Sequence, residues 1–247
     1  MKKILYIFFL MMIILLPAGK VAGDSVLMLK YPRPQSDKDT RHLYRIKLLE
    51  LALQKTSREY GPYRIEYSSE KMSQSRAIVM IKNNSGINLV ALPTSKQREA
   101  ELLPVRIPIL KGLLGYRIFI IRSGDSNKFR RIQNFDKLKK FSAGSGHDWL
   151  DSEILAYNGI NVIKSSNYEG LFMMLRVKRF DYFPRGVNEA FDEVESRKSK
   201  FSDIEVEQKI AFHYPFPVYF FVNKDNVLLA ERIEKGLRAA IDDGSFQ

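Results

Sequence analysis

The chain has 247 residues, enough for one large domain or two smaller ones, and 45% of them are hydrophobic, which is ordinary for a globular protein. Forty Lys and Arg residues stand against 28 Asp and Glu, which gives a formal net charge of +12. The absence of cysteine excludes disulfides and cysteine-bound metals, and the three histidines have no metal-ligand spacing, so we expect no metal and no cofactor.

The first 23 residues are typical of a secretory signal peptide. Lys2 and Lys3 precede an unbroken apolar run at 4–16, and small residues stand just before Asp24. The run is short for a membrane span, which favours a cleaved signal peptide over an uncleaved N-terminal anchor. Export without disulfides suits a bacterial periplasm.

Removal of this segment takes away three lysines and leaves a charge of +9. Nucleic acid is not an expected partner outside the cytoplasm. The surplus of positive charge instead indicates an anionic ligand or a nearby negatively charged membrane surface.

The first part of the mature chain alternates strands and helices. Apolar runs bounded by turn residues predict strands, and apolar residues spaced by three or four predict helices. The predicted elements are a strand at 25–31, a helix at 40–60 capped by Asp39 or Thr40 and stopped at Gly61, a strand at 63–67, a helix at 72–82 and a strand at 87–92. This order predicts an open, mainly parallel sheet whose ligands lie beyond the strand ends, near residues 32–37 and 93–99.

Residues 103–116 contain two prolines and two glycines and predict a connection that leaves this first lobe. The elements predicted after it are a strand at 117–122, a short helix at 135–140 capped by Asn134, a strand at 141–143, a turn at Gly144-Ser145-Gly146, a helix at 148–158, a strand at 160–164, a helix opened by a Ser166/Glu169 capping box and ending at 179, a strand at 180–184, a helix after Gly186, a strand at 216–223 and a helix at 228–241. The last pair is expected to return to the first lobe.

The predicted fold class is therefore two-lobed α/β, with the chain crossing between the lobes twice. We expect lobe 1 to comprise residues 24–112 and 214–247, and lobe 2 to comprise residues 113–213, inserted into lobe 1. Ligand sites favour clefts between such lobes.

The order of elements, the loop PTSKQRE at 93–99, the turn SAGSGHDW at 142–149 and the strand RFDYFPRG at 179–186 resemble a type 2 periplasmic solute-binding protein. The likeness is greatest to the amino-acid receptors of ABC transporters and covers essentially the whole mature chain. The resemblance implies a monomer without catalytic activity. Its hinged cleft would capture a small molecule and present it to a membrane permease.

In amino-acid receptors of this family, a Ser or Thr followed three residues later by Arg holds the ligand carboxylate, and Ser95 and Arg98 have that spacing. The glycine turn before a lobe 2 helix donates backbone N–H groups to the same carboxylate. The family's acidic residue for the ligand ammonium, four positions after the strand aspartate Asp181, is replaced by Arg185. An arginine cannot accept hydrogen bonds from an ammonium group, so we expect an anionic ligand.

We therefore predict that Arg98 and Arg185, one from each lobe, converge on the same solute. The rival role for Arg185 is an ion pair between the lobes, with Glu189 as partner. The remaining candidates for ligand contact are Tyr31, Arg33, Thr94, Ser145, Gly146 and Trp149. Trp149 is equally compatible with packing in the core of its lobe.

Two other functions stay open. A dehydratase-like enzyme on the same scaffold would use His147, Asp148 and Asp151 as acid and base, although a lone histidine near a helix start is more often a capping or surface residue. A ligand sensor that docks on a membrane histidine kinase or cyclase has the same sequence features as a transport receptor.

Overall fold

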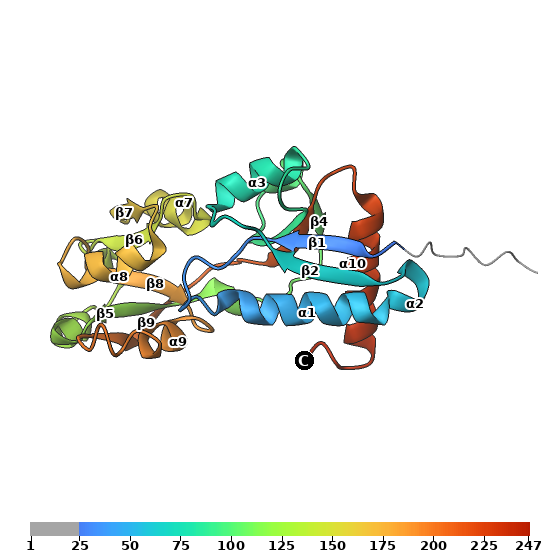
Figure 1. Cartoon of the computed structure of the whole chain (residues 1–247). Coiled ribbons are helices and arrows are strands. Elements are labelled where there is room, and N and C mark those ends of the chain that lie inside the picture. The colour runs from blue at the N-terminus through green and yellow to red at the C-terminus, as the bar shows by residue number, and fades with distance from the viewer. Residues whose placement is uncertain (1–24) are drawn as a thin grey trace, which may run out of the picture.

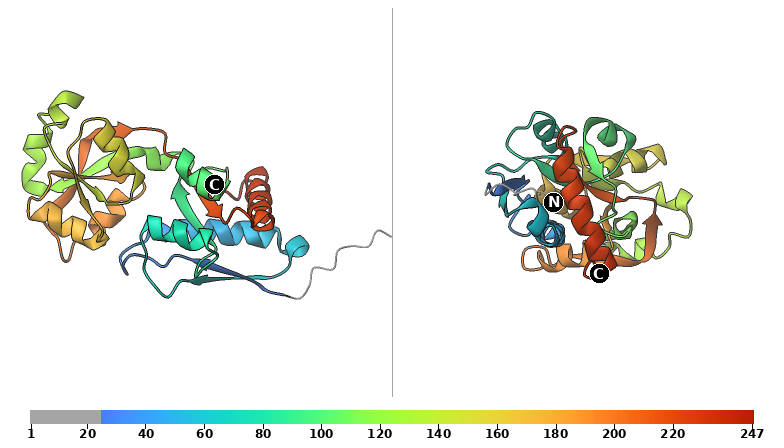
Figure 2. Two further views of the ribbon diagram at one scale, coloured as in Figure 1. Left: turned by 90° about the horizontal axis from the view of Figure 1, so that it is seen from above. Right: turned by 90° about the vertical axis from the view of Figure 1, so that its right-hand side faces the viewer.

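The structure is a computed structural model that describes residues 25–247, so the predicted signal peptide lies outside the described residues. Two α/β lobes lie side by side and are joined by narrow connections (Figures 1 and 2). Among residues 25–247, none of the helices combines the length and the apolar character that a membrane span requires.

Lobe 1 contains two small sheets. Strand β1 (Leu27–Tyr31) pairs in parallel with β2 (Tyr63–Tyr67), and β10 (Val218–Val222) pairs antiparallel with both β3 (Leu89–Pro93) and β4 (Leu103–Val105). The helices of this lobe are α1 (Arg41–Lys55), α2 (Ser57–Tyr60), α3 (Gln74–Lys82), α4 (Lys96–Glu101) and α10 (Val227–Asp242).

Helices α1 and α10 pack closely against each other in the core of lobe 1. Leu49, Leu53, Ile233 and Leu237 are all fully buried in one cluster. A Cβ atom added at Gly236 would lie 2.0 Å from the backbone oxygen of Ala52, so glycine is required where the two helices touch.

Lobe 2 is built on one five-stranded sheet of order β7-β6-β8-β5-β9. Its strands are β5 (Tyr116–Arg122), β6 (Ala143–Gly146), β7 (Val162–Ser165), β8 (Tyr182–Gly186) and β9 (Ile204–His213). Strand β6 runs parallel to β7 and β8, whereas β5 runs antiparallel to β8 and β9. The α-helices are α5 (Ser126–Phe129), α6 (Phe135–Leu138), α7 (Leu150–Tyr157), α8 (Tyr168–Arg176) and α9 (Ala190–Glu195), with 3-10 turns η1 (Leu113–Gly115) and η2 (Ser123–Asp125).

The chain crosses between the lobes after β4 and again between β9 and β10, which confirms the predicted fold of a second lobe inserted into the first. The two crossing segments touch, because the Tyr214 amide donates to the Gly115 carbonyl over 3.2 Å. A Cβ atom at Gly115 would lie 2.4 Å from the backbone oxygen of Tyr214.

Several local predictions were wrong. Residues 103–105, placed in the connection, form strand β4, and β9 was not predicted at all. In lobe 1 the predicted single, mainly parallel sheet is replaced by a two-stranded parallel sheet and a separate three-stranded antiparallel sheet. Helix α8 is capped by Asn167, which accepts from the Gly170 amide, rather than by the Ser166/Glu169 box.

The predicted turn at Gly144-Ser145-Gly146 was also wrong, because these residues form the buried strand β6. Glycine is required at two positions of this strand because aromatic rings pack directly against its backbone. A Cβ atom at Gly144 would lie 2.2 Å from the Phe180 ring, and one at Gly146 would lie 2.4 Å from the Trp149 ring. The turn comes later, at residues 147–149, before α7.

Candidate functional site

A cavity of about 120 Å³ lies between the two lobes. Lobe 1 contributes the loop after β1 and the starts of α1 and α3, while lobe 2 contributes the turn after β6 and the start of α8. Tyr31, Arg33, Gly146 and Trp149, four of the predicted contact residues, line this cavity.

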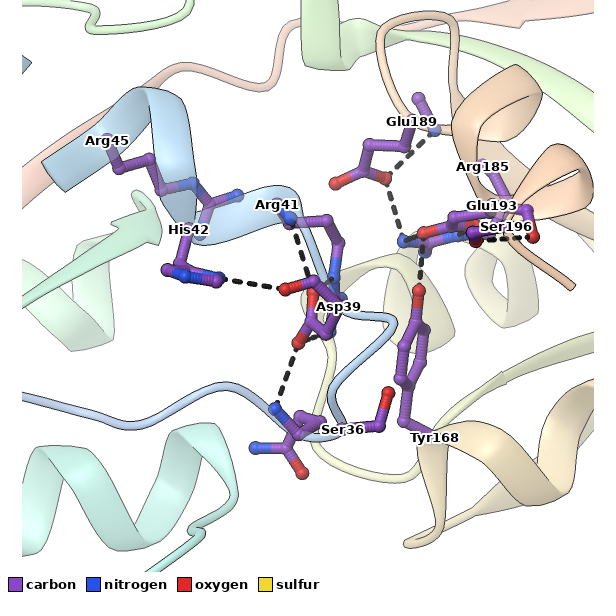
Figure 3. A network of polar contacts seen from close by, with 12 residues as sticks. Ser36, Asp39, Arg41, His42, Arg45, Tyr168, Arg185, Glu189, Glu193 and Ser196 are labelled. Atoms are coloured by element: carbon purple, nitrogen blue, oxygen red, sulfur yellow. Dashed lines mark hydrogen bonds and ion pairs between the residues drawn. The ribbon is translucent and has the colours of Figure 1, made fainter. Parts of the chain in front are cut away.

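Arg41 reaches from lobe 1 across the cleft to aromatic side chains of lobe 2. Its guanidinium carbon lies 4.0 Å from the ring centroid of Tyr168 and 5.6 Å from that of Trp149. On its own side Arg41 donates to both carboxylate oxygens of Asp39, over 2.7 and 2.8 Å (Figure 3). Burial would raise the pKa of Asp39, but the hydrogen bonds and charge of Arg41 outweigh burial and lower it.

Arg185 lies in a buried ion-pair cluster of lobe 2 (Figure 3). Its Nε and one terminal nitrogen each bind a carboxylate oxygen of Glu193 over 2.7 Å, and that terminal nitrogen also lies 2.8 Å from Glu189. Its guanidinium carbon lies 4.8 Å from the Trp149 ring centroid. The Tyr168 hydroxyl donates to Glu193 over 2.7 Å, which links this cluster to the aromatic side chain that Arg41 covers.

The pairing of Arg185 with Glu189 joins two residues of the same lobe rather than the two lobes. Burial alone would lower the pKa of Arg185, but the charges of Glu189 and Glu193 raise it well above its usual range. Contact between Arg185 and a ligand stays a prediction.

Arg98 lies in lobe 1 and is bound by uncharged oxygens. Its guanidinium donates to the Pro93 carbonyl over 2.7 Å and to the side-chain oxygen of Gln74 over 2.8 Å. Burial lowers the pKa of Arg98. Arg98 does not line the 120 Å³ cavity, whereas Gln74 does, so Arg98 positions a side chain that faces the cleft.

The neighbours of Arg98 have local roles in the described structure. The Ser95 hydroxyl accepts from the Arg98 amide and caps α4, and the Thr94 hydroxyl donates to Glu99 over 2.6 Å. Ser145 is buried in β6, where its hydroxyl accepts from Ser152 over 2.9 Å. The structure therefore does not bring Thr94, Ser95 or Ser145 to the cavity wall.

Two hydrogen bonds close the cleft at its edges. The Ser36 hydroxyl in lobe 1 donates to Glu169 on α8 over 2.6 Å, and the Ser75 amide at the start of α3 donates to Asp148 of lobe 2 over 2.7 Å. The second contact places a carboxylate at the N-terminus of α3, where the exposed amides favour negative charge. The described conformation is thus closed.

The residues of the enzyme hypothesis are not arranged around one reacting centre. His147 is exposed, and its ring nitrogen is 3.7 Å from Asp148. Asp151 instead faces the hinge, where it pairs with Arg117 over 2.7 Å and accepts from the Tyr214 hydroxyl over 2.5 Å. Within residues 25–247 no group of three or more His, Asp or Glu side chains has the arrangement of a metal site.

The sequence reasoning missed Arg41, Arg45 and Tyr168. Arg41 and Arg45 are four residues apart on α1, so they share one face of the helix, and this spacing is visible in the sequence. Which lobe this face meets depends on how the lobes close, and no local pattern reports that.

No protein-family model matches the sequence, and comparison with curated proteins gives no match. Solved structures do match. An ancestral arginine-binding protein bound to arginine is 18% identical, with a TM-score of 0.64 over 89% of this chain and 94% of its own. A histidine kinase sensor domain with similarity to periplasmic binding proteins is 12% identical, with a TM-score of 0.66 over 90% of this chain and 92% of its own.

A third structure is an ancestral amino-acid-binding protein, a precursor of cyclohexadienyl dehydratase. It is 14% identical, with a TM-score of 0.62 over 90% of this chain and 92% of its own. At these identities the likeness concerns the fold. The resemblance to type 2 periplasmic binding proteins is confirmed at that level.

Proposed function

We propose that this chain, built on the fold of type 2 periplasmic binding proteins, captures a small anionic, carboxylate-bearing solute between its lobes. The protein would act in the periplasm as a monomer and present the solute to the permease of an ABC transporter. Binding proteins of amino acids among the structural neighbours support the general role. The anionic character of the solute is argued from the charges below.

The observation that carries this proposal is that two arginines of the cavity wall, Arg33 and Arg45, and one directly behind it, Arg98, form no ion pair with a carboxylate among residues 25–247. Arg33 donates to the Ser69 carbonyl and Arg45 to the Ala91 carbonyl, while Arg98 binds only the neutral oxygens described above. None of the three forms an ion pair with another residue in the described part of the chain. An anionic solute would supply the missing negative charge, and arginine suits carboxylates because it donates two parallel hydrogen bonds.

The carboxylates near the cleft are already bound by the protein's own donors, which favours an anion rather than an amino acid as the ligand. Asp39 is bound by Arg41, and Glu189 is bound by Arg185. Asp148 already accepts the Ser75 amide. An ammonium group would therefore have to compete with the protein's own donors for each of these carboxylates.

The test is isothermal titration of the mature protein with matched solutes, for example succinate, glutamate, glutamine and arginine. We expect binding of the dicarboxylate and no binding of arginine. Native mass spectrometry of the purified protein would show a solute that survives purification. Binding of arginine or glutamine without binding of any carboxylate probe would contradict the proposal.

Arg33 provides a mutational test at the exposed rim of the cavity. We expect Arg33→Gln to weaken binding of the dicarboxylate by about two- to fivefold, because a solvated charge contributes little to binding. Arg64→Gln removes an exposed arginine on β2 that does not line the cavity and is the matched control. Equal affinities of wild type and Arg33→Gln for the dicarboxylate would show that Arg33 does not contribute to binding.

A membrane sensor is the second candidate for the partner, and one comparison favours it. The histidine kinase sensor domain has the same fold, and its alignment with this chain covers 90% of this chain and 92% of the sensor domain. Capture of the solute would be the same in both cases. Crosslinking of the loaded protein in membranes, followed by identification of the partner as a permease or a kinase, separates the two.

A further inference from the structure

One end of lobe 2 carries most of the net positive charge of the protein. Strand β5 starts at the hinge and ends at Arg122, and β8 runs antiparallel to it, with Tyr182 at its start opposite Ile121. The segments at this end are residues 122–131, 139–142 and 176–181, which we call the basic end. It lies at the left of Figure 1, farthest from α10.

Contacts between the three segments make the basic end one surface. Asp181 accepts the Ser142 amide over 2.9 Å and lies 3.0 Å from the ammonium nitrogen of Lys128. The Arg122 guanidinium donates to the Phe180 carbonyl over 2.7 Å. The segments therefore lie side by side at the end of the sheet.

The basic end contains nine Lys and Arg residues and two Asp residues, a net charge of +7. The whole chain after the predicted signal peptide has a net charge of +9. The adjoining loop at 198–205, which Asp203 links to Arg176 over 2.6 Å, contains two lysines and two acidic residues and adds no net charge. The positive charge is thus concentrated at one end of the molecule.

Most of these cations have no carboxylate partner. Four of the nine form ion pairs, namely Arg122, Lys128, Lys139 and Arg176. The other five are exposed and form no ion pair within residues 25–247, namely Arg130, Arg131, Lys140, Lys178 and Arg179. A surface with such a surplus of one sign attracts partners of the opposite charge.

The turn that ends α8 gives the basic end an exposed tip. Val177, Lys178 and Arg179 are all exposed, and Lys178 has a left-handed φ of 61°. The Arg179 amide donates back to the Met174 carbonyl over 2.9 Å, which holds the turn. An exposed apolar side chain beside two cations matches the boundary of a bilayer, where phosphates lie next to acyl chains.

We propose that the basic end of lobe 2 binds the surface of membranes that contain anionic phospholipid. The five unpaired cations are spread over three segments, which suits phosphates distributed over a bilayer better than one compact anion. The cleft lies at the other end of the lobe 2 sheet, where β6 ends at Gly146. A membrane bound at the basic end would therefore leave the cleft clear.

The test is co-sedimentation of the solute-free mature protein with vesicles of equimolar phosphatidylglycerol and phosphatidylcholine. We expect binding to these vesicles, no binding to phosphatidylcholine alone, and release by high salt, which screens exposed charges. Each cation near such a surface contributes about fivefold to binding, so the triple variant Arg131→Gln/Lys178→Gln/Arg179→Gln should bind about a hundredfold more weakly.

The matched control is the triple variant Lys47→Gln/Arg58→Gln/Arg76→Gln, which removes the same charge from exposed positions of lobe 1 outside the cleft. It should bind like wild type. Neither triple variant breaks an ion pair among residues 25–247, so both should fold. Wild-type binding by the basic-end variant, or equal losses in the two variants, would overturn the proposal. Equal binding to both kinds of vesicle would do the same.

A fluorescent label locates the contact. The chain has no cysteine, so Val177→Cys gives a single attachment point for a polarity-sensitive dye at the tip. Val79→Cys on α3 of lobe 1 is the control, because Val177 and Val79 are 58% and 53% exposed. We expect a blue shift with the anionic vesicles at residue 177 only, and the same response at both positions would contradict the proposed contact. Both experiments lack solute, so their results are independent of whether the cleft captures the proposed solute.

Discussion

Glu189 shows how single residues of this protein are held by several opposite charges. One of its carboxylate oxygens is 2.8 Å from Arg185, 3.7 Å from Arg117 and 3.2 Å from the Gly186 amide. Burial would raise the pKa of Glu189, but the charge of Arg185 and, after it, of Arg117 lowers the pKa to about 2 from its usual 4.5. The ionised form of Glu189 is thus favoured in the folded protein.

This shift predicts a contribution of Glu189 to acid stability. A lowered folded-state pKa stabilises the folded protein above about pH 4.5, and the contribution disappears as the pH falls towards about 2. We expect Glu189→Gln to lower the free energy of unfolding by an amount on the order of 3 kcal/mol at neutral pH. The difference from wild type should shrink across that acid range in urea unfolding experiments.

Glu195→Gln is the control for this experiment, because Glu195 is exposed and its ion pair in the described part of the chain is with Lys198 over 3.5 Å. We expect no comparable pH-dependent difference from wild type for this variant. A difference between wild type and Glu189→Gln that stays constant from neutral to acid pH would contradict the role given to Glu189.

Among the elements, α1 connects the core of lobe 1 with the cleft. Its buried face, with Leu49 and Leu53, packs in the lobe 1 core against α10, while its first turns present Arg41 and Arg45 to lobe 2. The close contact at Gly236 fixes how α1 lies against α10. A change at that contact therefore acts on stability and on the cleft together.

We expect Gly236→Ala to lower the free energy of unfolding by about 1–3 kcal/mol, because the added methyl group meets the Ala52 backbone rather than a flexible side chain. Gly124→Ala is the control, since among residues 25–247 no atom outside Gly124 and its two chain neighbours lies within 4 Å of the added Cβ. That variant should stay within about 0.5 kcal/mol of wild type in urea unfolding. Wild-type stability of Gly236→Ala would show that α1 and α10 can move apart at no cost.

Elements with clear apolar patterns were predictable from the sequence, and others were not. The alternation at 63–67 and the apolar run at 117–122 gave β2 and most of β5. Strand β9 was missed because its exposed half includes Gln208 and Lys209, which dilute the apolar pattern. Strand β6 was mistaken for a turn because of its two glycines. These glycines are needed for the close approach of the Phe180 and Trp149 rings, which come later in the chain and leave no local sign in the sequence.

The candidate site was predicted less completely than the fold. Four of the residues predicted to contact the ligand line the cavity, namely Tyr31, Arg33, Gly146 and Trp149. Whether they contact a ligand stays a prediction. The cross-lobe position of Arg41 depends on the closure of two bodies, and sequence spacing carries no information about that geometry.

At the scale of the whole molecule, Arg41 makes a contact that holds the two lobes together. It is bound to Asp39 within lobe 1 and lies over the ring of Tyr168 in lobe 2, so the second of these contacts exists only when the cleft is closed. Such a desolvated cation–π contact is worth about 2 kcal/mol, which corresponds to roughly a thirtyfold change in an equilibrium constant.

We therefore expect Arg41→Ala to shift the protein towards the open form, with a larger radius of gyration in small-angle X-ray scattering of the solute-free protein. Arg64→Ala, which removes an exposed arginine of lobe 1, should leave the radius unchanged. Identical scattering from wild type and Arg41→Ala would mean that other contacts hold the lobes together.

The hydrogen bonds from Ser36 to Glu169 and from Ser75 to Asp148 are made by the chain itself and need no solute. Closure of the lobes would therefore form these two bonds with or without a solute between them. If the function proposed above is correct, a membrane partner that recognises the closed outline would also meet closed molecules that hold no solute. Each such bond would then raise the solute concentration at which most of the closed molecules are filled.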